Sequence, residues 1–193
     1  MPELENEQAD KYRKRAASMP PLTNWYAPEV SCLQLHVTRI ACQRSNCWWN
    51  AKQRRRCAIV VLICIIGIFA AVLVLAMGQR FTSEDFVLKV AAPLSPALLL
   101  GIRQFIEHRE AANRLDKLRE HSEQVWKDAL KGTAEAEITT RSRGLQDEIF
   151  EHRKRNPPVC DALFKKLRDK LEAQMNRGIA GLVKEAKDKM RLP

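Results

Sequence analysis

Residues 57–77 read CAIVVLICIIGIFAAVLVLAM, a run of 21 residues without a charged side chain. At about 1.5 Å of rise per residue, a helix of this length spans about 30 Å, which is the thickness of the hydrocarbon core of a bilayer. A helix in a soluble core rarely stays apolar on every face for so long. The run therefore predicts a membrane-spanning helix, and a basic block, Lys52 and Arg54 to Arg56, directly precedes it.

A second and weaker span is predicted over 86–106, FVLKVAAPLSPALLLGIRQFI. Pro93 and Pro96 predict a kink in it, because proline has no N–H to donate to the helix. Ser95 or a neighbouring helix can satisfy the backbone groups that the prolines release. The kink is interpreted either as a gate or pore-lining bend or as a tolerated bend in an ordinary span.

The segment 78–85 alone separates the two spans, which predicts an antiparallel hairpin with both termini on one side of the membrane. Basic residues flank both spans on that side, whereas the connecting segment carries Arg80 against Glu84 and Asp85. The positive-inside rule therefore predicts a multi-pass protein with both termini in the cytoplasm. The net charge of +10 fits retention at the anionic face of a bilayer. Charges of alternating sign in the C-terminal segment argue against a nucleic-acid partner.

The segment after the second span predicts helices that pack together. Apolar or small residues recur there in steps of three and four, as in a coiled coil. A long helix should continue to about Lys131, a second should run from near Ala134 to the turn at 156–158, and a third should follow to about Met190. The seam of the first comprises Ala111, Leu115, Leu118, Ser122, Val125 and Ala129.

The predicted fold class is an all-α membrane protein, with an antiparallel transmembrane helical hairpin and a cytoplasmic helical bundle or coiled coil. Its parts are an N-terminal connector (1–33), a juxtamembrane basic helix (34–56), the transmembrane hairpin (57–106, with spans 57–77 and 86–106) and a cytoplasmic helical region (107–193).

The sequence shows no motif for catalysis. It lacks GxSxG, HExxH, a phosphate loop, GxGxxG and a paired CxxC. Cys42 and Cys47, with His36 nearby, do not have the spacing of a metal site. We therefore expect a protein that is not an enzyme and that holds no metal or cofactor.

Two stretches are distinctive, TRIACQRSNCWWNAKQRRR at 38–56 and RGLQDEIFEHRKRNPPVCDALFKKLR at 143–168. Together with LTNWYAPEV before the first and APLSP in the second span, they resemble the SMODS-associated four-transmembrane effectors. Members of that family are bacterial membrane proteins encoded beside synthases of nucleotide second messengers. Because they have two hairpins, the resemblance implies that this chain corresponds to the C-terminal part and lacks two spans, through a late start of the reading frame or as a natural fragment.

The resemblance implies an effector of an anti-phage or related conflict system in the bacterial inner membrane. It would act without catalysis, by oligomerising and perforating or disrupting the bilayer, in the manner of a pore-forming effector. Its partners would be the lipid bilayer, copies of itself and the missing hairpin, and the link to a cyclic nucleotide stays open. The alternative is a membrane-anchored scaffold or sensor whose cytoplasmic helices bind a partner protein.

The two distinctive stretches are also predicted to contact each other at the cytoplasmic edge of the membrane. Polar side chains of the first can offer several hydrogen bonds to carboxylates such as Asp147 or Glu148. Trp48 and Trp49 are interpreted first as anchors at the membrane interface. The predicted contact joins Arg39, Gln43, Arg44, Asn46, Trp48 and Trp49 to Arg143, Gln146, Asp147, Glu148, Arg153 and Pro157.

Overall fold

The computed structural model describes residues 26–78 and 82–190, and every element in those residues is helical, as predicted. Most of the predicted connector, 1–33, lies outside the described residues, as do 79–81 of the segment between the spans. The elements are η1 (Pro28–Cys32), α2 (Leu35–Gly78), α3 (Ser83–Phe86), η2 (Val87–Ala91), α4 (Ala92–Leu130), α5 (Glu135–Arg155) and α6 (Asp161–Met190).

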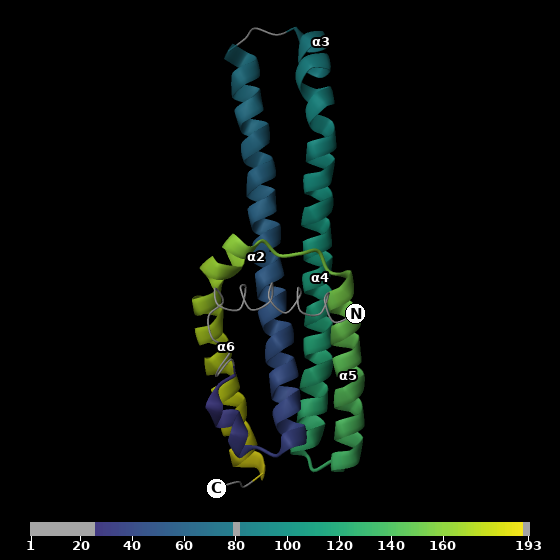
Figure 1. The fold of residues 1–193 in the computed structure, drawn as a ribbon, viewed down its shortest axis with the longest axis vertical. Coiled ribbons are helices and arrows are strands. Elements are labelled where there is room, and N and C mark those ends of the chain that lie inside the picture. The colour runs from purple at the N-terminus through teal and green to yellow at the C-terminus, as the bar shows by residue number, and fades with distance from the viewer. Residues whose placement is uncertain (1–25, 79–81, 191–193) are drawn as a thin grey trace, which may run out of the picture.

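Helix α2 is one uninterrupted helix of 44 residues. It joins the predicted juxtamembrane helix and the predicted first span, because no proline lies between Leu35 and Gly78. At 1.5 Å per residue it is about 66 Å long. Figure 1 shows it running through the whole length of the molecule, beside α4.

The upper part of α2 lies side by side with the upper part of α4, which η2 and α3 lead into, and these segments project beyond α5 and α6 in Figure 1. We call the two apolar segments the apolar pair (58–78 and 84–106). Large apolar side chains on it are exposed, among them Ile63, Ile66, Leu99 and Leu100. Both helices are long and apolar enough to cross a membrane. Their exposed surface suits lipid chains better than water.

The two helices of the apolar pair approach each other closely at Gly101 of α4. A Cβ atom at that position would lie 2.9 Å from Cγ1 of Ile65 on α2. Such a distance is below van der Waals contact, so a side chain at 101 must displace Ile65 or part the helices. The small residue therefore sets the spacing of the pair at this level.

The prolines of the second span lie at an irregular turn. Residues of η2 form a π-helical turn just before α4, closed by the Ala92 N–H, which donates to the Val87 carbonyl. A wide turn here makes room for Pro93, whose ring crowds the carbonyl four residues earlier. Ser95 Oγ donates to the Ala92 carbonyl at 2.9 Å, the group that Pro96 cannot bond. The predicted compensation by Ser95 is confirmed.

The lower parts of α2 and α4 pack with α5, α6 and η1 into a helical base (Figure 1). All members of the predicted seam of α4 are buried except Leu118, which is half-buried. α5 and α6 bury the apolar stripes that their sequences predict. The buried residues of these two helices include Ile138, Leu145, Ile149, Leu171, Met175 and Ile179.

The prediction that Trp48 and Trp49 anchor the chain at a membrane interface is wrong. Trp49 is 3% exposed and belongs to the core of the base, and Trp48 is half-buried against the same core. The reason is that α5 and α6 flank α2 beyond this level, so the base encloses these residues. The base reaches as far as Arg54, which is buried although it belongs to the basic block.

Candidate functional site

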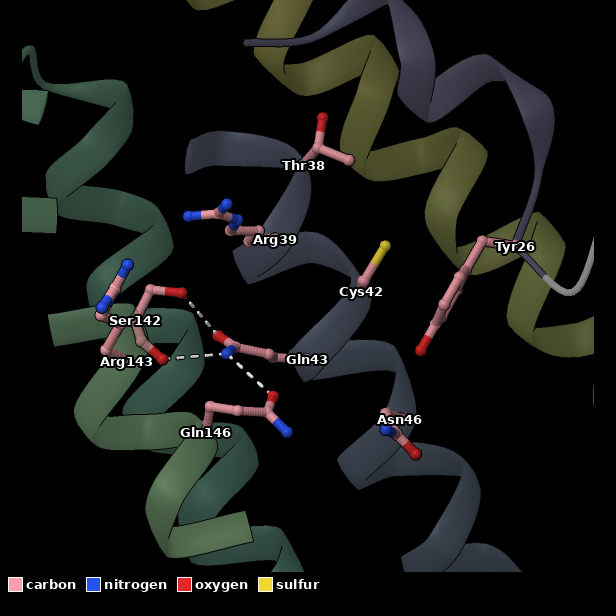
Figure 2. Close-up of a pocket in the computed structure, with 9 residues that line it drawn as sticks. All are labelled: Tyr26, Thr38, Arg39, Cys42, Gln43, Asn46, Ser142, Arg143 and Gln146. Carbon is pink, nitrogen blue, oxygen red and sulfur yellow. Dashed lines mark hydrogen bonds between the residues drawn. The ribbon is translucent and has the colours of Figure 1, made fainter. Parts of the chain in front are cut away.

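The two distinctive stretches meet where Gln43 of α2 faces α5. The Gln43 Nε2 atom donates to the Ser142 carbonyl (2.9 Å) and to Gln146 Oε1 (3.2 Å), and Ser142 Oγ donates to Gln43 Oε1 (3.1 Å). Gln43 and Ser142 are both buried. Since the amide donates and accepts at once, its orientation is fixed (Figure 2). We call this group the Gln43 cluster.

A cavity of about 450 Å³ opens beside the Gln43 cluster. Figure 2 shows it across one face of α2, with α5 at one end and Tyr26 at the other. Two arginines and several neutral polar side chains line it, and no acidic residue does. The lining residues are Tyr26, Thr38, Arg39, Cys42, Gln43, Asn46, Ser142, Arg143 and Gln146.

Two titratable groups in the cavity, besides its arginines, are neutral at pH 7. Burial raises the pKa of the Cys42 thiol to about 11, so it is not a thiolate nucleophile. Burial likewise raises the pKa of Tyr26. The charge of the cavity is therefore that of Arg39 and Arg143.

A second contact lies nearer the apolar pair, where α5 ends. Arg54 of α2 donates from Nη1 to the Pro157 carbonyl at 2.9 Å. Beside it, the side chains of His152 and Asn156 approach to 2.6 Å between Nδ1 and Nδ2. Burial, with Arg114 and Arg54 nearby, lowers the pKa of His152 to about 4. The imidazole is therefore neutral at pH 7 and accepts the Asn156 N–H at Nδ1.

The predicted pairing of arginine with the carboxylates of α5 is wrong. Arg44 Nη2 lies 3.2 Å from Glu123 Oε2, on α4. Although burial favours the neutral acid, Arg44 and Lys127 hold the pKa of Glu123 below its ordinary value. Asp147 is exposed, and Glu148 Oε2 lies 3.9 Å from His121 Nδ1. Because α5 turns its buried face toward α2 and α4, Asp147, two positions after Leu145, points away from both helices, whereas Glu148, three positions after Leu145, lies on the side toward α4.

The structure thus brings together part of the predicted contact. Arg39, Gln43 and Asn46 share the cavity with Arg143 and Gln146. Pro157 contacts α2 through Arg54. The side chains of Arg44, Trp48, Trp49, Asp147, Glu148 and Arg153 do not line the cavity.

Sequence reasoning missed Tyr26, Ser142, Arg54 and His152. Ser142 stands one residue before the second stretch, and nothing in the sequence marks it as the partner of Gln43. The sequence places Arg54 among the basic residues that predict topology, although its spacing of eleven from Gln43 puts both on one side of a helix. That spacing is the signal that could have identified it.

No cluster of three or more residues able to ligate a metal occurs in 26–78 and 82–190. His36 Nδ1 lies 3.4 Å from Glu135 Oε1, and Cys47 is buried among Leu145 and Ile149. Burial raises the pKa of Cys47 to about 12, which keeps it a thiol. These groups are part of the packing of the base.

The comparison with protein families gives one match. The model of the SMODS-associating 4TM effector domain matches residues 2–182, which includes both helices of the apolar pair and most of the base. No curated protein and no solved structure matches the chain significantly.

Proposed function

Because this chain belongs to the family of SMODS-associating 4TM effectors, we propose that it is an effector of a bacterial conflict system linked to a nucleotide second messenger. It acts in the inner membrane, without catalysing a reaction, by oligomerising and opening the bilayer. The base lies in the cytoplasm together with both termini. The positive-inside rule supports this orientation, since basic residues of the base surround the start of the apolar pair.

The observation that carries the proposal is the continuity of α2. The same helix holds the Gln43 cluster in the base and 58–78 in the apolar pair. A helix without a proline or other break moves as a rigid element. A change in how α5 packs on α2 therefore changes the position of the apolar pair, as in switches that move packed helices.

The size of the apolar pair supports oligomerisation. Two helices cannot enclose a water-filled path, and the apolar pair exposes large side chains such as Ile63, Phe69 and Leu99. Further helices are needed to line a pore, supplied by copies of this chain or by a further hairpin of the same protein. Helices in a bilayer associate through packing and small residues at their contacts.

The test is membrane permeability. The chain, and a form extended by a further hairpin, are expressed in bacteria and reconstituted in liposomes. We expect loss of membrane potential in cells and release of an entrapped dye when the second messenger is supplied. The measurement is a potential-sensitive dye in cells and fluorescence dequenching in liposomes.

The matched control is Arg177→Ala, an exposed change on α6 whose side chain bonds only a carbonyl of its own helix. It should leak like the unchanged chain. If both forms insert and leave the bilayer sealed with the messenger present, the effector proposal fails. A membrane-anchored scaffold, whose base binds a partner protein, then takes its place.

A further inference from the structure

The cavity beside the Gln43 cluster has an unbalanced positive charge. Arg39 and Arg143 are exposed and have no ion-pair or hydrogen-bond partner in the part of the chain that the structure describes. Several other arginines of the base are paired with carboxylates, such as Arg141 with Asp128 at 2.9 Å. Glu135, which lines an adjoining depression together with Arg143, has its Oε1 atom 3.4 Å from His36 Nδ1. Guanidinium groups without a carboxylate nearby are suited to bind an anion.

The cavity is also elongated, and its two ends differ in chemistry. Figure 2 shows Arg39 and Arg143 at the α5 side and Tyr26 beyond Cys42 and Asn46. The arginine end suits a phosphate, which guanidinium groups bind in a bidentate manner. At the other end, the Asn46 amide can form hydrogen bonds with the polar edge of an aromatic ring in a ligand. The Tyr26 ring can contact the face of that ligand ring. The volume of about 450 Å³ is that of a small-molecule site.

The position of the cavity favours a soluble ligand over a lipid. Gln43 precedes Cys57, where the apolar run begins, by 14 residues of continuous helix. That separation is about 21 Å along the axis. The headgroup region adds only about 5 to 7 Å to each side of the hydrocarbon core. A headgroup bound at the membrane surface therefore does not reach the arginines.

We propose that this cavity binds a soluble nucleotide, with its phosphate between Arg39 and Arg143 and its base beside Asn46 and Tyr26. Such a ligand bridges α2 and α5 at the Gln43 cluster. This inference deepens the proposed function and rests on it only for what binding does to the membrane. Binding itself is a separate property of the base.

The experiment is titration calorimetry on the full chain in detergent, with a cyclic dinucleotide and ATP as nucleotide probes and inorganic phosphate for comparison. We expect at least one nucleotide to bind more tightly than phosphate, and to bind more weakly as salt rises. Arg39→Ala and Arg143→Ala should each weaken it about tenfold or more, as loss of a charge-assisted bond does. Tyr26→Ala should weaken the binding of the nucleotide and leave the affinity for phosphate unchanged.

The matched control is again Arg177→Ala, which removes the same charge from an exposed helix face outside the cavity. It should bind like the unchanged chain. Circular dichroism and thermal unfolding of the variants show whether they fold. Arg39→Lys and Arg143→Lys should keep part of the affinity, since they keep the charge but lose the bidentate geometry.

Several results would overturn the proposal. These are no binding of either nucleotide, equal affinity for phosphate alone, equal loss with Arg177→Ala, or displacement by vesicles of phosphatidylglycerol or by an acidic peptide that binds more tightly. Nucleotide binding without dye release would uphold the site and reject the effector proposal. Dye release by a chain that binds no nucleotide would reject the site alone.

Discussion

At the scale of single residues, the buried amide of Gln43 joins α2 to α5 through three hydrogen bonds. Gln43→Leu removes its bonds with Ser142 and leaves the buried Ser142 hydroxyl without this partner, while the Ser142 carbonyl keeps the backbone bond of α5. A buried group left unpaired costs about 1 to 3 kcal/mol. We expect the free energy of unfolding of the base to fall by about 2 kcal/mol or more, measured by chemical denaturation in detergent.

The control for that change is Gln124→Leu, at an exposed residue whose amide bonds only Asp128 of the same helix. A surface change of this kind is expected to stay within about 0.5 kcal/mol. Equal stability of the Gln43→Leu and Gln124→Leu variants would mean that the Gln43 cluster contributes nothing to the packing of α5.

His152 makes the stability of the base depend on pH. Its pKa in the folded chain is about 4, because of burial and then of Arg114 and Arg54, whereas an exposed histidine titrates near 6.5. Between these values the unfolded chain binds a proton that the folded chain excludes, so stability falls as pH falls. We expect a loss on the order of 2 to 3 kcal/mol from this group between pH 7 and pH 4.

Denaturation curves across that range measure the effect. The His152→Gln variant should lose less stability on acidification, by about the same amount, while the exposed His121→Gln should behave like the unchanged chain. His108 adds to the same trend, since burial and Arg54 lower its pKa too. A His152→Gln variant with an unaltered pH profile would show that His152 charges freely inside the base.

At the scale of elements, the close approach of the apolar pair makes Gly101 sensitive to size. Gly101→Val places a Cβ 2.9 Å from Cγ1 of Ile65, whereas the Cβ of Gly67→Val meets nothing within 4 Å. Overpacking typically costs about 1 to 3 kcal/mol. We expect Gly101→Val to lower the unfolding temperature in detergent and Gly67→Val to leave it nearly unchanged, and the reverse order would place the contact elsewhere.

The effector proposal can be tested at the π turn and the prolines of the second span. Replacing Pro93 and Pro96 together by alanine restores two N–H groups, so that the Ala92 carbonyl gains an ordinary partner in place of Ser95. We expect the variant still to insert in the membrane, because the span stays apolar. We expect dye release to be suppressed, because the second span becomes a regular helix without the irregular turn. Full leakage by the double variant would reduce the prolines to tolerated residues of an ordinary span.

Helix positions could be predicted from the sequence because their signals are local. α4 ends at Leu130, close to the predicted Lys131, and Gly132 follows it in the left-handed region with φ of 88°. Pro157 and Pro158 lie between α5 and α6, where the sequence predicts the turn. Gln146 belongs to the predicted contact of Gln43, but Ser142 as a partner of Gln43 and Glu123 as the partner of Arg44 could not be predicted, since they are 99 and 79 residues away. A charge pattern offers many such pairings, and only the rotation of each helix selects one.

At the scale of the whole molecule, the orientation in the membrane is the property to test. Cys160 is exposed on the base, between α5 and α6. In a chain whose other cysteines are serine, we expect Cys160 to react with a membrane-impermeant maleimide only after cells are permeabilised. Thr82→Cys, placed in the segment between the spans of a chain without Cys160, should react in intact spheroplasts, and the opposite result for both would invert the topology.

How far the base extends along α2 is a feature of the whole molecule that could not be predicted from the sequence. A tryptophan pair beside a basic block has the pattern of a membrane interface, yet Trp49 lies in the core and Arg54 donates to Pro157. The difference arises because helices distant in sequence rise past the end of the predicted interface. Local composition cannot show how far a neighbouring helix extends.

The unbroken course of α2 makes it a lever. From Gln43 to Gly78 the helix extends over 35 residues, or about 52 Å. A tilt of about 10° about Gln43 therefore carries the far end sideways by about 9 Å, close to the diameter of a helix. A small tilt of α2 within the base is thus large enough, at the opposite face of the bilayer, to move the end of α2 from one neighbouring helix to another.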